Sequence, residues 1–237
     1  MRVTFLDHSG FLVETGTAAL LFDWWKGTLP DLAPGVPLYV FASHAHPDHF
    51  DPRIFALDDG SRDIRFLLGH DIKLSERNCR RWGLSKETAV RCQSLKGGQI
   101  LPLPDVTVEA LPSTDEGAAF LVTLGDRTLY HAGDLNWWHW EGEDKAWNRN
   151  QEVNFQRWTE PLRGRRLDLA MLPLDPRLGE AGFLGPAHLL EKAEVRHFLP
   201  MHQWGDFGFT EAFLQRHGAF RSITIPVERP GQTFELE

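Results

Sequence analysis

The segment His44-Ala45-His46-Pro47-Asp48-His49 gathers three histidines and one aspartate into six residues. Imidazole is the commonest metal ligand near neutral pH, because its nitrogen lone pair is available without a large protonation cost. His44 and His46 are one residue apart, so they point to the same side of an extended segment. Asp48 and His49 extend the ligand set within a turn that Pro47 stiffens. Core packing does not explain this density, and the segment predicts a metal centre that activates water.

A single short segment cannot enclose an ion, so further ligands must come from elsewhere in the chain. The leading candidate is Asp134 in His131-Ala132-Gly133-Asp134, where Gly133 permits an unusual backbone path just before the carboxylate. The second candidate is His202 in Pro200-Met201-His202. Each has a simpler interpretation, since Asp134 could cap the segment that follows and His202 could be an ordinary loop histidine. Spacing alone leaves both interpretations open.

The order of these motifs resembles the metallo-β-lactamase superfamily. His44–His49 matches its HxHxDH motif, Tyr130–Asp134 matches the segment whose aspartate bridges two metals, and Pro200–His202 matches its last ligand position. The resemblance implies an α/β fold, an αββα sandwich of two mixed β-sheets flanked by helices, with a site that holds one or two Zn²⁺ ions. The early segment Asp7–Gly10 is most similar to the lactonase-like branch of metal-dependent hydrolases.

The sequence departs from this family at one ligand. The family places another histidine between the HxHxDH motif and the bridging aspartate, whereas this chain has Pro112–Gly117 there, without a histidine. Asp115 is the best replacement, because a carboxylate can ligate the same ion. Thr114 is a weaker ligand, and Glu116 requires a loop shifted by one residue. A carboxylate would move the metal preference towards Mn²⁺ or Fe²⁺, with Zn²⁺ still compatible.

The resemblance implies one ligand set for each of two ions. The first ion would be held by His44, His46 and Asp115. The second would be held by Asp48, His49 and His202, and Asp134 would bridge the two.

These ligands predict a metallo-hydrolase. Metal binding lowers the pKa of a coordinated water towards about 7, which supplies hydroxide for attack on a small ester, lactone or phosphodiester. Asp48 would help to orient this nucleophile. His139, His131 and His188 are candidates for the proton donor, with His139 named first, and each could instead have a structural role or support a ligand. Two other classes fit the same residues: a diiron-type redox protein, and a non-catalytic metal-binding protein with a degenerate site.

Nine tryptophans stand out in the composition. Trp137, Trp138 and Trp140 directly follow Asp134, and Trp24-Trp25 and Trp204 also lie near candidate ligands. They would serve equally well as core or as the aromatic wall of a substrate pocket.

The hydrophobic pattern predicts strands in two blocks, with helices concentrated after each. Candidate ligands follow three of the strands directly, where loops on a rigid scaffold usually carry binding groups. The predicted strands are 3–6, 11–14, 18–22, 38–41, 64–68, 99–101, 106–111, 118–123, 127–131, 167–172, 195–199 and 223–225, and the predicted helices are 72–82, 153–162, 187–192 and 210–216.

Composition narrows the functional class further. The 237 residues, 42% hydrophobic, suit one domain over residues 1–237, and a net charge of −8 argues against nucleic acid or an anionic membrane as partner. The expected partner is a small-molecule substrate. No signal segment or long apolar stretch is visible, and the two cysteines show no CxxC spacing, so a cytoplasmic, reducing environment is expected.

Overall fold

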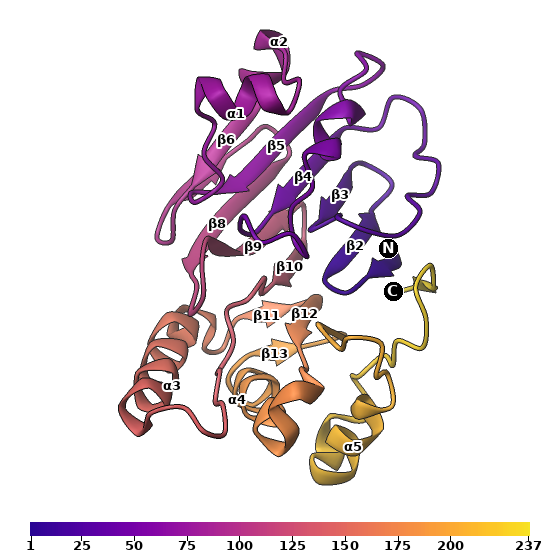
Figure 1. Ribbon diagram of the computed structural model, residues 1–237. Coiled ribbons are helices and arrows are strands. Elements are labelled where there is room, and N and C mark those ends of the chain that lie inside the picture. The colour runs from indigo at the N-terminus through magenta and orange to yellow at the C-terminus, as the bar shows by residue number, and fades with distance from the viewer. The chain divides into compact units, whose positions relative to one another are not determined.

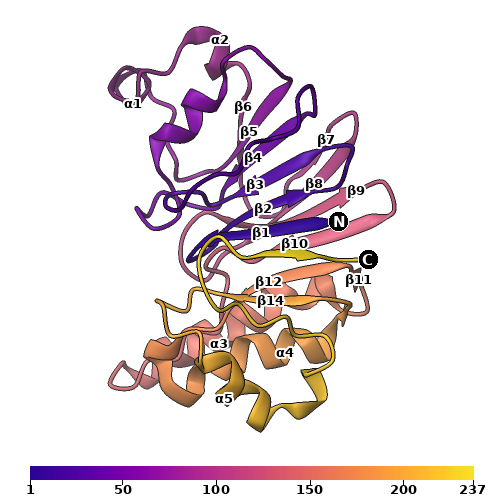
Figure 2. The ribbon, with the colours of Figure 1, turned by 90° about the vertical axis from the view of Figure 1, so that its right-hand side faces the viewer.

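The computed structural model describes residues 1–237 and shows two compact units, each built on one large mixed sheet. The first unit comprises residues 1–95 and 229–237, and the second comprises residues 96–228. Figures 1 and 2 show the two sheets and the helices that accompany each. None of the helices combines the length and apolar character that crossing a bilayer requires.

The first unit holds a seven-stranded sheet in the order β15-β1-β2-β3-β4-β5-β6. Antiparallel pairing joins the first four of these strands and parallel pairing joins β3 to β6. The strands are β1 (Arg2–Asp7), β2 (Gly10–Glu14), β3 (Ala19–Phe22), β4 (Leu38–Ala42), β5 (Ile64–Gly69), β6 (Cys92–Leu95) and β15 (Thr233–Glu235).

One face of this sheet is covered by short helices. The 3-10 helix η1 (Pro52–Leu57) contributes Ile54 and Phe55 to a cluster that includes Val40 and Phe66 from the sheet. Helix α1 (Glu76–Arg81) follows, then α2 (Lys86–Ala89). Strand β4 is buried at every position, as expected of a central strand of parallel sheet.

The second unit holds a six-stranded sheet in the order β14-β12-β10-β9-β8-β7 and a two-stranded ribbon of β11 and β13. Its helices are α3 (Lys145–Thr159), α4 (Leu184–Lys192) and α5 (Phe209–Arg216), with the 3-10 helices η2 (Glu160–Leu162), η3 (Pro176–Phe183) and η4 (Gly218–Phe220). The strands are β7 (Ile100–Pro102), β8 (Val106–Pro112), β9 (Ala118–Leu124), β10 (Arg127–His131), β11 (Arg166–Leu167), β12 (Leu169–Pro173), β13 (Glu194–Val195) and β14 (Phe198–Met201).

Most predicted elements are confirmed, and the differences have local causes. The helix predicted from Ile72 begins only at Glu76, because Ser75 caps its N-terminus and Ile72 is buried. The helix predicted from Val153 begins at Lys145, capped by Asp144.

Three further strand predictions need correction. The strands predicted over 167–172 and 195–199 are each divided into two, and the strand predicted over 223–225 is only an isolated bridge between Phe198 and Thr224. Strands β6 and β15 and helix α2 were missed, since the short polar segments that form them show no clear periodicity.

A close backbone contact fixes the end of β4, where the HxHxDH motif begins. A Cβ atom added to Gly69, at the end of β5, would lie 2.0 Å from the carbonyl oxygen of Ser43. Only glycine therefore allows β5 to pass this close to Ser43.

We expect Gly69→Ala to destabilise the protein by about 2 kcal/mol or more, because the added methyl must displace the backbone at Ser43. Chemical denaturation would measure this loss. Gly218→Ala is the matched control, since no atom lies within 4 Å of a Cβ added there. Equal stability of the two variants would contradict the steric explanation.

Candidate metal centre

The first unit brings four of the predicted ligands together at the end of β4. His44 Nε2 and His46 Nδ1 lie 3.0 Å apart, and the rings of His44 and His49 have centroids 4.2 Å apart. Two ring nitrogens this close cannot both carry a proton towards each other, but two lone pairs can converge on one cation. His44 and His49 are buried, whereas His46 is exposed, which leaves this ligand accessible from solvent.

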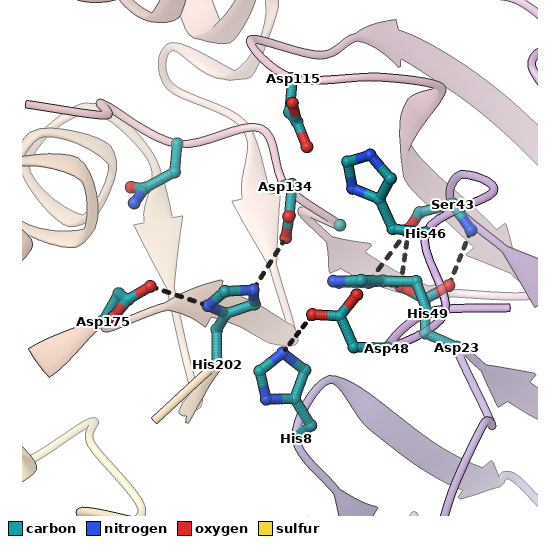
Figure 3. A network of polar contacts seen from close by, with 12 residues as sticks. His8, Asp23, Ser43, His46, Asp48, His49, Asp115, Asp134, Asp175 and His202 are labelled. Atoms are coloured by element: carbon teal, nitrogen blue, oxygen red, sulfur yellow. Dashed lines mark hydrogen bonds and ion pairs between the residues drawn. The ribbon is translucent and has the colours of Figure 1, made fainter. Parts of the chain in front are cut away.

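Asp23 organises these histidines from behind. Its side chain is fully buried at the end of β3 and accepts hydrogen bonds from Ser43 N (2.7 Å), Ser43 Oγ (2.7 Å) and His49 Nδ1 (2.7 Å). Figure 3 shows this carboxylate together with Ser43 and His49. Because the carboxylate only accepts, His49 must carry its proton on Nδ1 and present Nε2 as a lone pair.

Ser43 fixes the position of the proton on His44 in the same way. Its hydroxyl proton is given to Asp23, so its oxygen accepts from His44 Nδ1 at 2.9 Å. His44 therefore also carries its proton on Nδ1 and directs the lone pair of Nε2 towards His46, the form in which imidazole binds a metal. The sequence pattern did not reveal this role of Asp23. Its position directly after a buried strand, like that of Asp134, was the available signal.

His8 joins the group although the sequence analysis did not propose it. Its Nε2 lies 3.5 Å from Asp48 Oδ2, and His8, Asp48 and His49 each offer a ligand atom within 4.8 Å of the others. Burial raises the pKa of Asp48, but hydrogen bonding, chiefly from His8, outweighs it and holds this pKa well below its usual range. Asp48 is therefore ionised and ready to act as a ligand. The backbone of His8 lies in the left-handed region at φ 54°. An isolated histidine in the sequence does not predict this conformation.

In the second unit, the loops after β8 and β10 bring Asp115 and Asp134 together. Each offers a carboxylate oxygen within 4.8 Å of the other. The Thr114 hydroxyl donates to the carbonyl oxygen of Asn136 (2.7 Å) and accepts from its amide (3.0 Å). Thr114 thus connects the two loops by hydrogen bonds. Its hydroxyl, considered above as a weaker alternative to Asp115 as ligand, is engaged in these bonds. Gly133 has φ 50°, as the backbone argument predicted.

His202 lies beside Asp134 after β14. Its Nε2 is 3.5 Å from Asp134 Oδ1, and its Nδ1 is 3.0 Å from Asp175 Oδ2 (Figure 3). Asp175 is fully buried, two residues beyond β12. Burial raises the pKa of Asp175, but hydrogen bonds from His202 and Arg177 outweigh it and lower this pKa. His202 therefore resembles His49 in having a carboxylate oxygen at Nδ1, while its Nε2 faces the Asp134 carboxylate.

The candidate proton donors lie in different surroundings. His139 is exposed, whereas His131 is buried and accepts from Gly133 N at 3.1 Å. His188 packs edge-on against Trp137 and Phe155, and burial and nearby Lys192 lower its pKa. Its aromatic contacts support the structural interpretation of His188.

The predicted aromatic residues divide between the two interpretations. Trp138 is buried and its Nε1 donates to the carbonyl oxygen of Asp134 at 3.0 Å, so it supports the ligand loop. Trp204 is 50% exposed and meets the ring of His202 edge-on at 5.7 Å. Core packing thus accounts for Trp138, whereas half of the Trp204 surface is exposed.

The histidines and carboxylates found in the two units fit a divalent metal. Three imidazoles, those of His44, His49 and His202, have Nδ1 within hydrogen-bond distance of an oxygen. Each unit also supplies carboxylates, Asp48 in the first and Asp115 and Asp134 in the second. Residues 2–146 match the family model described as a β-lactamase superfamily domain. The chain belongs to the metallo-β-lactamase superfamily.

Individual relatives agree with membership of this superfamily. A protein of Desulforamulus reducens named UPF0173 metal-dependent hydrolase is 26% identical over 216 residues, covering 85% of this chain and 84% of the relative. Among solved structures, Igni18, a metallo hydrolase from Ignicoccus hospitalis, has a TM-score of 0.63 at 18% identity, covering 100% of this chain and 99% of its own.

A second solved structure has the same fold and a different chemistry. CmlA, a diiron β-hydroxylase from Streptomyces venezuelae, has a TM-score of 0.66 at 12% identity, covering 99% of this chain and 54% of its own. The two mixed sheets with their helices are thus the metallo-β-lactamase fold, and the family places the chain among metal-dependent hydrolases.

We expect Asp23→Asn to weaken metal binding about 10- to 100-fold, as loss of such an outer hydrogen bond typically does. An amide that still accepts from Ser43 N turns its NH₂ towards His49, which favours the tautomer with a proton on Nε2. Competition with a coloured chelator would measure zinc affinity. Asp59→Asn is the matched control, because Asp59 is an exposed turn residue that accepts from Ser61 N at 2.9 Å. Wild-type affinity in a folded Asp23→Asn protein would refute this role.

Proposed function

We propose that this protein hydrolyses a small ester, lactone or phosphodiester with water activated on a mono- or dinuclear metal centre. The observation that carries the proposal is the shared state of His44, His49 and His202, each with Nδ1 engaged by an oxygen. Such preparation of three imidazoles serves no purpose in packing, and it is the usual arrangement of metal-binding histidines.

We assign the ligands from the donor groups of the two units and the family's motif order. His44, His46 and Asp115 would hold one ion, Asp48, His49 and His202 the other, and Asp134 would bridge. Zn²⁺ suits the imidazoles, while three carboxylates also suit Mn²⁺ or Fe²⁺. When bound, the metal would lower the pKa of its water towards about 7 and polarise the carbonyl or phosphoryl oxygen of the substrate.

The surrounding residues would orient the reactants. Ionised Asp48 accepts hydrogen bonds and would align the attacking water, while His8 keeps Asp48 in place. Trp204 offers an exposed ring for a planar or apolar part of the substrate. His139 is the proposed proton donor to the leaving group, and its exposure leaves the imidazole free to exchange protons with solvent.

Metal analysis and a substrate panel test the proposal together. Protein purified without added metal would be analysed for zinc, manganese and iron, then assayed with phosphodiesters, lactones and thioesters. We expect one or two ions of zinc or manganese per chain, with turnover of at least one substrate class. Iron with oxygen consumption would instead support a diiron redox protein, and bound metal without turnover would support a non-catalytic metal-binding protein.

Asp115→Ala tests the carboxylate that takes the place of the missing histidine. We expect it to lower metal content by up to one ion per chain and to reduce kcat/KM at least 10-fold, since the first ion would lose one of three protein ligands. Asp126→Ala, at an exposed hairpin turn, is the matched control and should keep full metal content. Unchanged metal content in Asp115→Ala would remove Asp115 from the ligand set.

A further inference from the structure

We propose that Arg177 is a positioning residue that fixes the Asp175 carboxylate and, through it, the imidazole of His202. The inference rests on the proposed function in one respect, the use of His202 as a metal ligand. Arg177 lies at the start of η3 and belongs to none of the motifs recognised in the sequence.

The guanidinium holds Asp175 by a fork. Its Nε lies 3.0 Å from both carboxylate oxygens, and its Nη2 lies 2.6 Å from Oδ2. Oδ1 also accepts the backbone N–H of Arg177 at 2.9 Å, as the N-cap of η3. With His202 Nδ1 on Oδ2, both oxygens of this buried carboxylate are fully engaged. The carboxylate cannot rotate without breaking several of these bonds.

Two tryptophans hold the guanidinium in turn. Its central carbon lies 4.5 Å from the ring centre of Trp204 and 5.4 Å from that of Trp140. Cation–π attraction of this kind is worth about 0.5–1 kcal/mol at exposed sites. Trp140 stacks on Trp138 at 6.3 Å, and both Trp138 and Trp204 meet the His202 ring edge-on at 5.7 Å. Arg177 is therefore held among the same tryptophans that surround the histidine it orients.

The other forked arginine pairs of this unit have no such connection. Arg221 forms two bonds with Glu211, but both side chains are more than half exposed. Exposed pairs of this kind contribute about 0–1 kcal/mol. Asp175 is fully buried, so loss of Arg177 would leave a buried carboxylate short of its main partner. Because its partner is buried, the Arg177–Asp175 pair differs from an exposed surface ion pair.

The effect of Arg177 on His202 is a choice of tautomer and ring orientation. A carboxylate held in one plane accepts from Nδ1 and keeps the lone pair on Nε2, beside Asp134. A carboxylate free to rotate about its Cβ–Cγ bond gives a weaker, less directed hydrogen bond, so both neutral tautomers become populated.

Arg177→Gln and Arg177→Lys in the full chain test the proposal, with Arg221→Gln as the matched control. Long-range ¹H–¹⁵N spectra of the metal-free protein at fixed pH would report the His202 tautomer, and chelator competition would report zinc affinity. We expect a single Nδ1–H tautomer in the wild type and in Arg221→Gln. In Arg177→Gln we expect mixed tautomers and a zinc dissociation constant about 10-fold higher, with Arg177→Lys intermediate.

Two results would overturn the proposal. One is an unchanged His202 tautomer in Arg177→Gln, or in Arg177→Lys if the glutamine variant does not fold. The other is an equal change in the Arg221→Gln control. If Arg177→Gln changes the His202 tautomer but the wild-type protein binds no zinc, manganese or iron, the positioning role stands and the proposed function is rejected. The failure of the proposal and the failure of the proposed function are therefore distinguishable.

Discussion

The buried Asp23 carboxylate is the constraint on which the first unit's site depends. A charge removed from water is tolerated only when its lone pairs are used, and Asp23 uses them on Ser43 and His49. Parallel pairing of β3 with β4 sets the end of one strand beside the start of the ligand segment, so the sheet register determines which groups reach the carboxylate. The close approach of Gly69 to Ser43 fixes the same point from the other neighbouring strand.

The second unit also has a buried carboxylate that orients a histidine, but different residues hold it. Asp175 also follows a buried parallel strand, and it also uses one oxygen to hold the Nδ1 of a candidate ligand. It differs in needing an arginine to hold it, where Asp23 relies on a serine and backbone amide. The two carboxylates show how a strand end can prepare a histidine for metal without touching the metal itself.

The fold and the candidate site could be predicted from the sequence only where residues form a local pattern. The HxHxDH motif, Asp134 and His202 are recognisable because dense or ordered ligand residues are rarely explained by packing, and long alternating or apolar runs predicted most strands. Asp23, Asp175 and Arg177 were missed as organising residues because single charged residues carry no pattern. Their roles arise from strand register, which only the folded chain reveals. The single domain predicted over residues 1–237 stays a prediction.

Strand β15 gives the first unit a dependence on the order of synthesis. It pairs with β1 through Val3 and Phe234, and Met1 N donates to Leu236 O at 2.7 Å. A ribosome therefore delivers β1 first and its edge partner only after residues 96–228 have emerged. Until then the outer edge of β1 has unpaired backbone groups, the feature that makes nascent sheets prone to mispairing. The pairing of β15 with β1 thus protects this edge only after the second unit has been made.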